Sequence, residues 1–251
     1  MGEDRSRRRA AQRGQLSDTP ERSRGGAFFG RRKGHPLRPH QAALMESLLP
    51  RLALDLKAPA PAPLASLFAH APEVIGLEIG FGGGEHLVAQ AATHPDMGFI
   101  GCEPFVNGMA KALALIEAQG LSNRGNIRLH FGDASDLLAW LPPGALARID
   151  LLYPDPWPKR RHWKRRFVQE QRIVELARVL RPGGVFRFAT DWPDYAAWTL
   201  ERLICSPLFA WTAERADDWR KPWQGFTQTR YEAKAIQAGR APCYLVFRRA
   251  A

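Results

Sequence analysis

The chain has 251 residues, of which 45% are hydrophobic and 24% are charged, and its formal net charge is +11. This length and composition suit one domain with a large core, and they exclude a wholly disordered chain or a small disulfide-stapled protein. Bases outnumber acids by 11 to 4 in residues 1–40 and by only 25 to 21 in the remainder. The excess of positive charge indicates a polyanionic partner, with DNA, RNA and acidic membranes all open at this point.

Three cysteines, Cys102, Cys205 and Cys243, lack CxxC spacing. They argue against a disulfide framework and a zinc site, and they indicate a reducing compartment. The sequence contains no run of about 18 apolar residues, and its arginine-rich start lacks the apolar core of a signal peptide. A mitochondrial transit peptide is the alternative interpretation of this start, which four acids in the first 21 residues weaken. We expect a cytoplasmic protein with neither membrane span nor metal.

Residues 1–27 contain few apolar side chains and are expected to form a disordered basic arm, with residues 28–251 as the folded domain. A helix is predicted to begin at Pro39, because Leu44, Leu48, Leu49 and Leu52 follow at helical spacing. The closely spaced prolines Pro59, Pro61 and Pro63 then form a stiff spacer.

From residue 74 onward, short apolar runs alternate with helical patterns. The predicted strands are 74–79, 99–103, 127–131, 149–153, 185–190, 209–214 and 244–248. The predicted helices are 85–93, 104–119, 134–141 and 167–180. This order predicts an α/β domain with a seven-stranded, mostly parallel sheet and helices on both faces.

The first strand of this sheet runs into a glycine-rich turn. Gly80, Gly82 and Gly84 follow the spacing GxGxG rather than the dinucleotide spacing GxGxxG, and Glu78 precedes them. Such a turn is either simply tight or lets a ligand approach the backbone closely. A carboxylate here disfavours pyrophosphate and favours a cationic nucleoside without phosphate.

Two further acids follow the next two strands. Glu103, 19 residues after Gly84, stands where a carboxylate can accept both ribose hydroxyls, although an acid also suits a helix start. Asp133 is placed either to receive an adenine amino group or to cap the helix that begins at Ala134. With Glu78, these acids indicate S-adenosylmethionine, which carries a sulfonium charge and no phosphate.

The fourth strand opens into PDPWPKRRHWKRR, residues 154–166. Its three prolines set Asp155 and Trp157 on a stiff segment. Six bases between 159 and 166, without an acid, predict a clamp for a polyanion, with Trp157 and Trp163 as stacking surfaces for an exposed base. A solvated helix start is the alternative, but bases at that end oppose the helix dipole.

The segment 153–169, YPDPWPKRRHWKRRFVQ, resembles the signature of the tRNA (guanine-N7)-methyltransferase family. The similarity covers about residues 28–249 and includes GRRKGHPLRPHQ, LEIGFGGGEHL, LRPGG, ATDWPDYA, TRYEAKAIQAG and LVFRR. It implies a Rossmann-like class I methyltransferase fold that uses S-adenosylmethionine and releases S-adenosylhomocysteine. The implied partner is tRNA, methylated on the guanine at position 46 of its variable loop.

The resemblance also implies roles for individual residues. Those implied to contact the methyl donor are Glu78, Gly80, Gly82, Glu103, Asp133 and Asp155, with Asp155 also catalytic. Those implied to hold the substrate are Lys159, Asp191, Thr229, Arg230, Tyr231 and Glu232. Those implied to form an RNA-contacting loop are Arg161, His162, Trp163, Lys164, Arg165 and Arg166. No motif indicates an obligate protein partner.

The C-terminal motif departs from the family pattern, since residues 240–244 read RAPCY instead of a glycine-rich Asp-Leu segment. Without the resemblance, residues 229–232 would suit an ordinary approach to a strand. The remaining tryptophans are expected to serve packing, namely Trp192, Trp198, Trp211, Trp219 and Trp223.

The expected chemistry is simple, because N7 of guanine keeps an in-plane lone pair and needs no general base. Asp155 and Asp191 are then expected to offset the charge that develops on the ring or to bond its amino edge. Three rival functions remain: an amino-group methyltransferase, a nicotinamide-dependent oxidoreductase and an RNA-binding protein without turnover. The single proline after Asp155 weighs against the amino-group methyltransferase, and the GxGxG spacing weighs against the oxidoreductase. The four retained acids weigh against an RNA-binding protein without turnover.

Overall fold

The computed structural model describes residue 30 and residues 32–251, so the arm predicted at 1–27 lies outside the described part. The α-helices are α1 (Pro39–Ser47), α2 (Leu49–Leu52), α3 (Glu85–Thr93), α4 (Val106–Ala118), α5 (Ala134–Trp140), α6 (Glu170–Val179), α7 (Pro193–Ile204), α8 (Asp217–Arg220) and α9 (Arg230–Gln237). The 3-10 helices are η1 (Leu64–Leu67) and η2 (Arg160–Arg165). The strands are β1 (Ile75–Ile79), β2 (Gly98–Cys102), β3 (Ile127–His130), β4 (Leu146–Leu152), β5 (Leu180–Thr190), β6 (Phe209–Trp211) and β7 (Cys243–Arg249).

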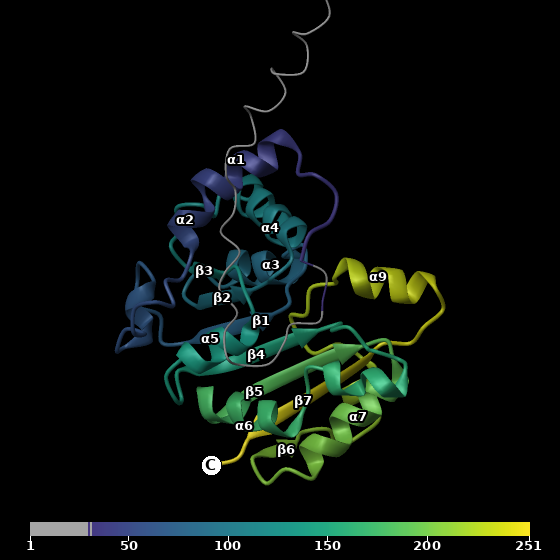
Figure 1. Cartoon of the computed structure of the whole chain (residues 1–251). Coiled ribbons are helices and arrows are strands. Elements are labelled where there is room, and N and C mark those ends of the chain that lie inside the picture. The colour runs from purple at the N-terminus through teal and green to yellow at the C-terminus, as the bar shows by residue number, and fades with distance from the viewer. Residues whose placement is uncertain (1–29, 31) are drawn as a thin grey trace, which may run out of the picture.

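The strands form one sheet in the order β3-β2-β1-β4-β5-β7-β6 (Figure 1). Strands β1 to β5 pair in parallel, whereas β7 runs antiparallel to both of its neighbours. The predicted seven-stranded, mostly parallel sheet is therefore confirmed. The chain passes from β1 outward to β2 and β3 and then crosses back to β4 on the other side of β1. The strand order reverses at this point, which is where open parallel sheets bind ligands.

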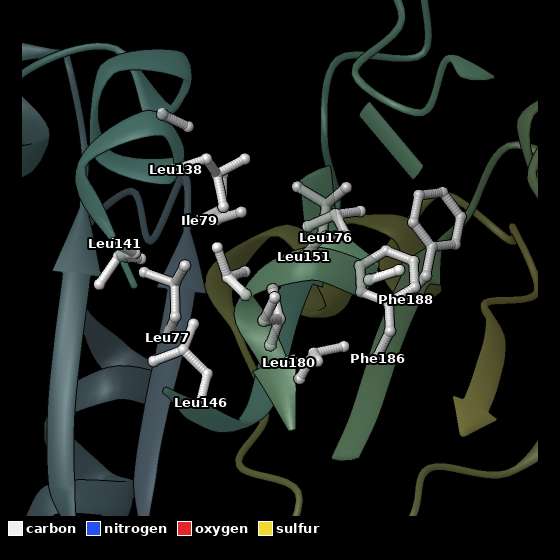
Figure 2. Close-up of a cluster of buried hydrophobic side chains, with 14 of the residues drawn as sticks. Leu77, Ile79, Leu138, Leu141, Leu146, Leu151, Leu176, Leu180, Phe186 and Phe188 are labelled. Carbon is white, nitrogen blue, oxygen red and sulfur yellow. The ribbon is translucent and has the colours of Figure 1, made fainter. Parts of the chain in front are cut away.

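Helices cover both faces of the sheet. The larger apolar cluster lies between the sheet and helices α5, α6 and α7, and the second lies under α1 to α4. Figure 2 shows Leu77, Leu151 and Phe186 of three strands facing Leu138 of α5 and Leu176 of α6. Each such side chain stabilises the fold by about 2 kcal/mol when it leaves water. These layers fix the strand ends that carry the site.

Several predicted boundaries were wrong by three or more residues, namely those of the helix at 167–180 and of the strands at 149–153, 185–190 and 209–214. The helix predicted at 167–180 begins only at Glu170, because the hydroxyl of Tyr195 accepts a hydrogen bond from the backbone N–H of Phe167 at 3.0 Å. The side chain of Gln169 donates to the carbonyl of Trp163 at 2.8 Å and keeps this stretch out of the helix. The fifth strand begins at Leu180, where the predicted helix was to end.

Helices α7 and α9 were not predicted, although both begin with ordinary signals. Pro193 occupies the first turn of α7, and the hydroxyl of Thr229 accepts from the N–H of Glu232 at the start of α9. Residues 229–232 therefore begin a helix and do not lead directly into a strand. Packing was the correct expectation for the five tryptophans, which lie against apolar clusters, namely Trp192, Trp198, Trp211, Trp219 and Trp223.

Gly84 joins the glycine turn to α3 in a conformation that side chains rarely adopt. Its φ is +81°, and a Cβ there would lie 2.7 Å from Cβ of Ala112 in α4. Gly120 has a similar φ of +68°, but a Cβ there would meet nothing within 4 Å. The two glycines therefore share the backbone requirement and differ only in the close approach of α3 to α4.

This pair separates backbone strain from helix packing. We expect Gly120→Ala to lower the free energy of unfolding by about 1–2 kcal/mol, the cost of a left-handed alanine. Gly84→Ala is expected to cost about 2 kcal/mol more, because α3 must also move away from α4. Urea unfolding of both variants measures the difference, and equal losses would contradict the packing argument.

Candidate active site

A cavity of about 640 Å³ opens at the carboxyl ends of β1 and β4, where the strand order reverses. Its wall is built from the segments that follow β1, β2, β3 and β4, together with residues of α6 and α9. The predicted site residues that line it are Gly80, Gly82, Glu103, Asp133, Asp155, Lys164, Arg165, Arg166 and Tyr231. Residues from all three predicted sets, for methyl-donor contact, RNA contact and substrate binding, therefore line the same cavity.

The glycine turn after β1 lies open to this cavity. Gly80 has a φ of +70°, and a Cβ there would meet no protein atom within 4 Å. Gly82 has a φ of +60°, and a Cβ there would lie 3.0 Å from the ring of Tyr231 in α9. Larger side chains at these positions would strain the turn and fill the space in which a ligand can approach the backbone.

Glu103, directly after β2, holds the glycine turn. One carboxylate oxygen accepts from the N–H of Gly82 at 2.6 Å, and the other accepts from the N–H of Phe105 at 2.9 Å. The side chain is buried, and this desolvation raises the pKa of the carboxyl to about 7 against the two hydrogen bonds, which lower it. Each oxygen keeps a lone pair for a donor in the cavity.

Glu78 lies two residues before Gly80 and is not among the lining residues. Its carboxylate contacts Nδ1 of His86 in α3 at 2.8 Å, and both side chains are buried. Burial raises the pKa of the Glu78 carboxyl, and the neighbouring imidazole opposes this shift. This contact ties the end of β1 to α3, and the expected contact of Glu78 with the methyl donor stays a prediction.

Asp133 caps the helix that follows it and also stands at the cavity wall. Its carboxylate accepts from the N–H of Ser135 at 2.8 Å and so caps α5. The same residue also lines the cavity. Arg172 of α6 donates to the hydroxyl of Ser135 at 2.6 Å and lines the cavity beside it, a contribution that no sequence motif announced.

Asp155 lies on a constrained loop after β4. The neighbouring Tyr153 and Trp157 both have positive φ, +50° and +45°, which is uncommon for side chains of this size. The N–H of Tyr153 donates to the carbonyl of Ala189 at 2.7 Å, which ties the loop to β5. The loop partly desolvates the Asp155 carboxyl and raises its pKa. An acid is thus held at the cavity by a backbone that other contacts must keep in place.

The basic segment after this loop forms η2, and most of its cations face outward. Lys159, Arg160, Arg161 and Lys164 are exposed. Trp157 lines the cavity, and the guanidinium of Arg165 lies 5.0 Å from its ring centre. These residues form a cationic surface on one side of the cavity mouth.

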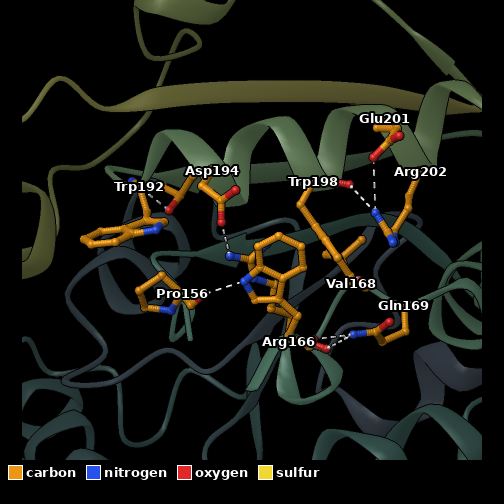
Figure 3. Close-up of polar contacts among 11 residues, drawn as sticks. Pro156, Arg166, Val168, Gln169, Trp192, Asp194, Trp198, Glu201 and Arg202 are labelled. Atoms are coloured by element: carbon orange, nitrogen blue, oxygen red, sulfur yellow. Dashed lines mark hydrogen bonds and ion pairs between the residues drawn. The ribbon is translucent and has the colours of Figure 1, made fainter. Parts of the chain in front are cut away.

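Two members of the predicted RNA-contacting loop point inward instead. Arg166 is only 2% exposed, although one edge of it reaches the cavity wall, and its guanidinium bonds the carbonyl of Pro156 and the carboxylate of Asp194 (Figure 3). Trp163 packs on Trp198, with ring centres 5.4 Å apart. Protein groups therefore surround Arg166, for which a contact with RNA was expected.

Most of the other predicted substrate residues make contacts within the protein. Asp191 pairs with Arg240 at 2.6 Å, Arg230 lies 3.7 Å from Glu85, and Thr229 caps α9. Glu232 is buried and accepts from the hydroxyl of Tyr244, while one of its oxygens has no hydrogen-bond partner. Tyr231 alone of the 229–232 group lines the cavity. Arg240 belongs to the divergent C-terminal segment, and its pairing with Asp191 could not be read from a motif.

Within the described residues, no three His, Cys, Asp or Glu side chains group as metal ligands would. In the same part of the chain, no helix is long and apolar enough to cross a membrane.

Known proteins share this architecture. A 16S rRNA methyltransferase, KamB, superimposes with a TM-score of 0.54 at 14% identity over 77% of this chain and 95% of its own. TrmN from Thermus thermophilus superimposes with a TM-score of 0.50 at 20% identity over 76% of this chain and 48% of its own. At such identities the likeness shows the Rossmann-like methyltransferase fold and nothing finer.

Sequence relatives are much closer. A tRNA (guanine-N(7)-)-methyltransferase of Rhodopseudomonas palustris (strain BisB18) is 63% identical over 232 residues, which cover 92% of this chain and 90% of the relative. The protein of the same name from Bradyrhizobium diazoefficiens is 61% identical over 223 residues, or 89% and 93% of the two chains. A family model described as "Putative methyltransferase" matches residues 72–245. With this fold and these relatives, the chain belongs to the tRNA (guanine-N(7)-)-methyltransferase family.

Proposed function

We propose that the protein transfers a methyl group from S-adenosylmethionine to N7 of the guanine at position 46 in the variable loop of tRNA. The observation that carries the proposal is the cavity at the strand ends, whose wall combines an open glycine turn with Glu103, Asp133 and Asp155. The identity of more than 60% to proteins named tRNA (guanine-N(7)-)-methyltransferase supports tRNA and guanine N7 as the targets.

The donor set of the cavity fits a cationic nucleoside without phosphate. Glu103 keeps a lone pair on each oxygen for the two ribose hydroxyls, and Asp133 is placed to accept from the adenine amino group. Three carboxylates at this wall would repel a pyrophosphate. When bound, the donor supplies an electrophilic methyl group on a sulfonium, and release of a neutral thioether ends the transfer.

The residues around the reacting atoms need to position the base and offset charge. Attack by the N7 lone pair removes no proton, so a general base is not required. Asp155 orients the guanine and offsets the positive charge that develops on its ring. Partial desolvation by the loop raises the pKa of the Asp155 carboxyl, although the side chain stays accessible from the cavity.

We assign tRNA binding to the cationic surface beside the cavity, whose predicted members are Lys159, Arg161, His162, Lys164 and Arg165. Exposed bases neutralise phosphates and release counterions, which makes affinity dependent on salt. Tyr231 is 43% exposed at the cavity and offers a ring for the target base, and Arg230 donates to its hydroxyl at 3.2 Å. We also assign Arg230 and Asp191 to substrate binding. Thr229 and Glu232 act by holding the start of α9 in place.

The rival functions can be distinguished by the ligand that the protein binds and by the product that it forms. A nicotinamide-dependent oxidoreductase would bind NAD, whereas we expect calorimetry to detect S-adenosylmethionine and no NAD. An amino-group methyltransferase would give a product methylated outside the ring. A binding protein without turnover would retain tRNA and transfer nothing. We further propose that the enzyme acts in the cytoplasm and without an obligate protein partner.

Three tRNA transcripts test the proposed atom and position. A transcript with guanosine at position 46 is expected to accept one methyl group, and one with adenosine there is expected to accept none. A transcript with 7-deazaguanosine at position 46 replaces N7 by carbon and is also expected to accept none. Methylation of the adenosine transcript would contradict the position, and methylation of the deaza transcript would contradict the atom.

Asp155→Ala is expected to lower kcat by about 10²-fold or more, because the charge on the guanine ring then lacks its carboxylate. The melting temperature should remain within a few degrees of wild type, since Asp155 is exposed and makes no ion pair in the described structure. Asp96→Ala, an exposed acid on the loop that precedes β2, is the matched control. Turnover near the wild-type rate in Asp155→Ala would exclude the assigned role.

Glu103 predicts a pH dependence of donor affinity. Ribose hydroxyls donate to the ionised carboxylate, so affinity should rise as pH increases from about 6 to 8, through the pKa of about 7, and then level off. Glu103→Gln should bind the donor at least about tenfold more weakly at pH 8 and show no such rise. Calorimetry at four pH values makes the comparison, and parallel profiles would contradict it.

Without ligand, the raised pKa of Glu103 should make the folded protein less stable as pH rises, whereas donor affinity should increase over the same range. Because the folded pKa is raised above the ordinary 4.5, the native state binds more protons than the unfolded state between these values. The free energy of unfolding should therefore fall by about 3 kcal/mol as pH rises from 4.5 to 7, relative to Glu103→Gln. Urea unfolding across this range measures it, and an identical pH dependence in both proteins would refute the shift.

A further inference from the structure

Arg166 is the last base of the cationic run but lies apart from the others. Its side chain is fully buried, whereas Lys164, two residues earlier, is exposed. Nε donates to the carbonyl of Pro156 at 2.9 Å, and Nη2 pairs with Asp194 in the first turn of α7 (Figure 3). Burying a guanidinium costs several kcal/mol unless it is well paired, so this placement needs compensation.

Three aromatic rings supply part of that compensation. The guanidinium carbon lies 4.8 Å from the ring centre of Trp163 and 5.0 Å from those of Tyr195 and Trp198. Each desolvated cation–π contact is worth about 1–2 kcal/mol. Two of the rings belong to α7 and the third to η2, so the cation joins these two elements through their aromatic side chains.

Arg166 and two of the rings around it hold the loop that carries Asp155 at its two ends, each through hydrogen bonds of its own. The carbonyl that Arg166 holds belongs to Pro156, the residue directly after Asp155. The hydroxyl of Tyr195 accepts from the N–H of Phe167, and the indole of Trp198 donates to the carbonyl of Val168 at 2.8 Å. The loop from 154 to 168 is thereby tied to α7 next to Asp155 at one end and at its exit at the other.

A planar guanidinium suits this task better than an ammonium does. Arginine bonds the Pro156 carbonyl and the Asp194 carboxylate with two nitrogens while its face stacks on the rings. Lysine carries one nitrogen and no planar face, so it can keep the charge but not the whole contact set.

We infer that Arg166 is a positioning residue, which holds the Asp155 loop against α7 so that the carboxylate meets the guanine, and that it does not bind RNA. The inference rests on the proposed role of Asp155. The positive φ values at Tyr153 and Trp157 are the strain that this anchor must retain. A displacement of about 1 Å at such a site can cost about 10²-fold in rate.

Arg202 offers a matched control within the same cluster. Its guanidinium also stacks on Trp198, 3.2 Å from the ring centre, but it pairs with Glu201 and makes no hydrogen bond with the Asp155 loop (Figure 3). Lys164→Met provides the comparison for an exposed cation of the same run. The experiment therefore uses Arg166→Met, Arg166→Lys, Arg202→Met and Lys164→Met in the full chain.

Three measurements distinguish anchoring from RNA binding. Hydrogen exchange of residues 157–168 is expected to be about tenfold faster in Arg166→Met, because the anchor of the loop is lost. The kcat at saturating tRNA and S-adenosylmethionine should fall about 10²-fold, with Arg166→Lys between wild type and Arg166→Met. The slope of log affinity for tRNA against log salt should match wild type in Arg166→Met and decrease by about one in Lys164→Met. Arg202→Met should match wild type in all three.

Specific outcomes would overturn the inference. A salt slope reduced by about one in Arg166→Met, with unchanged exchange and kcat, would make Arg166 an RNA contact. Faster exchange with unchanged kcat would show that the loop anchor does not matter for transfer. If Arg166→Met does not fold, Arg166→Lys decides by the same criteria. Wild-type protein that transfers no methyl group to tRNA would contradict the proposed function, while the exchange comparison would still decide the anchoring.

Discussion

The parallel strands point their carboxyl ends to one edge of the sheet, and the strand order reverses between β1 and β4. Because neighbouring loops must diverge at this reversal, a cavity forms between the segments that follow these strands. Everything assigned to the site depends on that constraint. The glycine turn, Glu103, Asp133 and Asp155 come from four separate stretches of chain and meet only because their strands are adjacent.

Acidic and basic side chains occupy different places around this cavity. The acids Glu103 and Asp133 take backbone N–H donors on the inner side and keep free lone pairs toward the cavity. The exposed cations of η2 stay in water, where a polyanion can reach them. Arg166 is an exception among these cations, because its ion pair with Asp194 and its contacts with aromatic rings bury it inside the protein. The proposed function needs this separation, because it requires a cationic donor and an anionic RNA to bind side by side.

The strands, the sheet class and the cavity acids that follow strands could be predicted, because their signals are local. Apolar runs define the strands, and an acid directly after a strand must lie at the carboxyl edge. The burial of Arg166 could not be predicted, because it depends on Tyr195 and Trp198, about 30 residues away in the sequence. The contact of Glu78 with His86, eight residues later, could not be predicted either, because it depends on how α3 folds back against β1.

The central claim is that this cavity brings a methyl donor to N7 of guanine in tRNA. The most direct measurement is nucleoside mass spectrometry of total tRNA that lacks the modification, after incubation with the purified protein and S-adenosylmethionine. The account predicts accumulation of 7-methylguanosine and of no other methylated nucleoside. Methyl transfer to a different nucleoside, or no transfer at all, would contradict it.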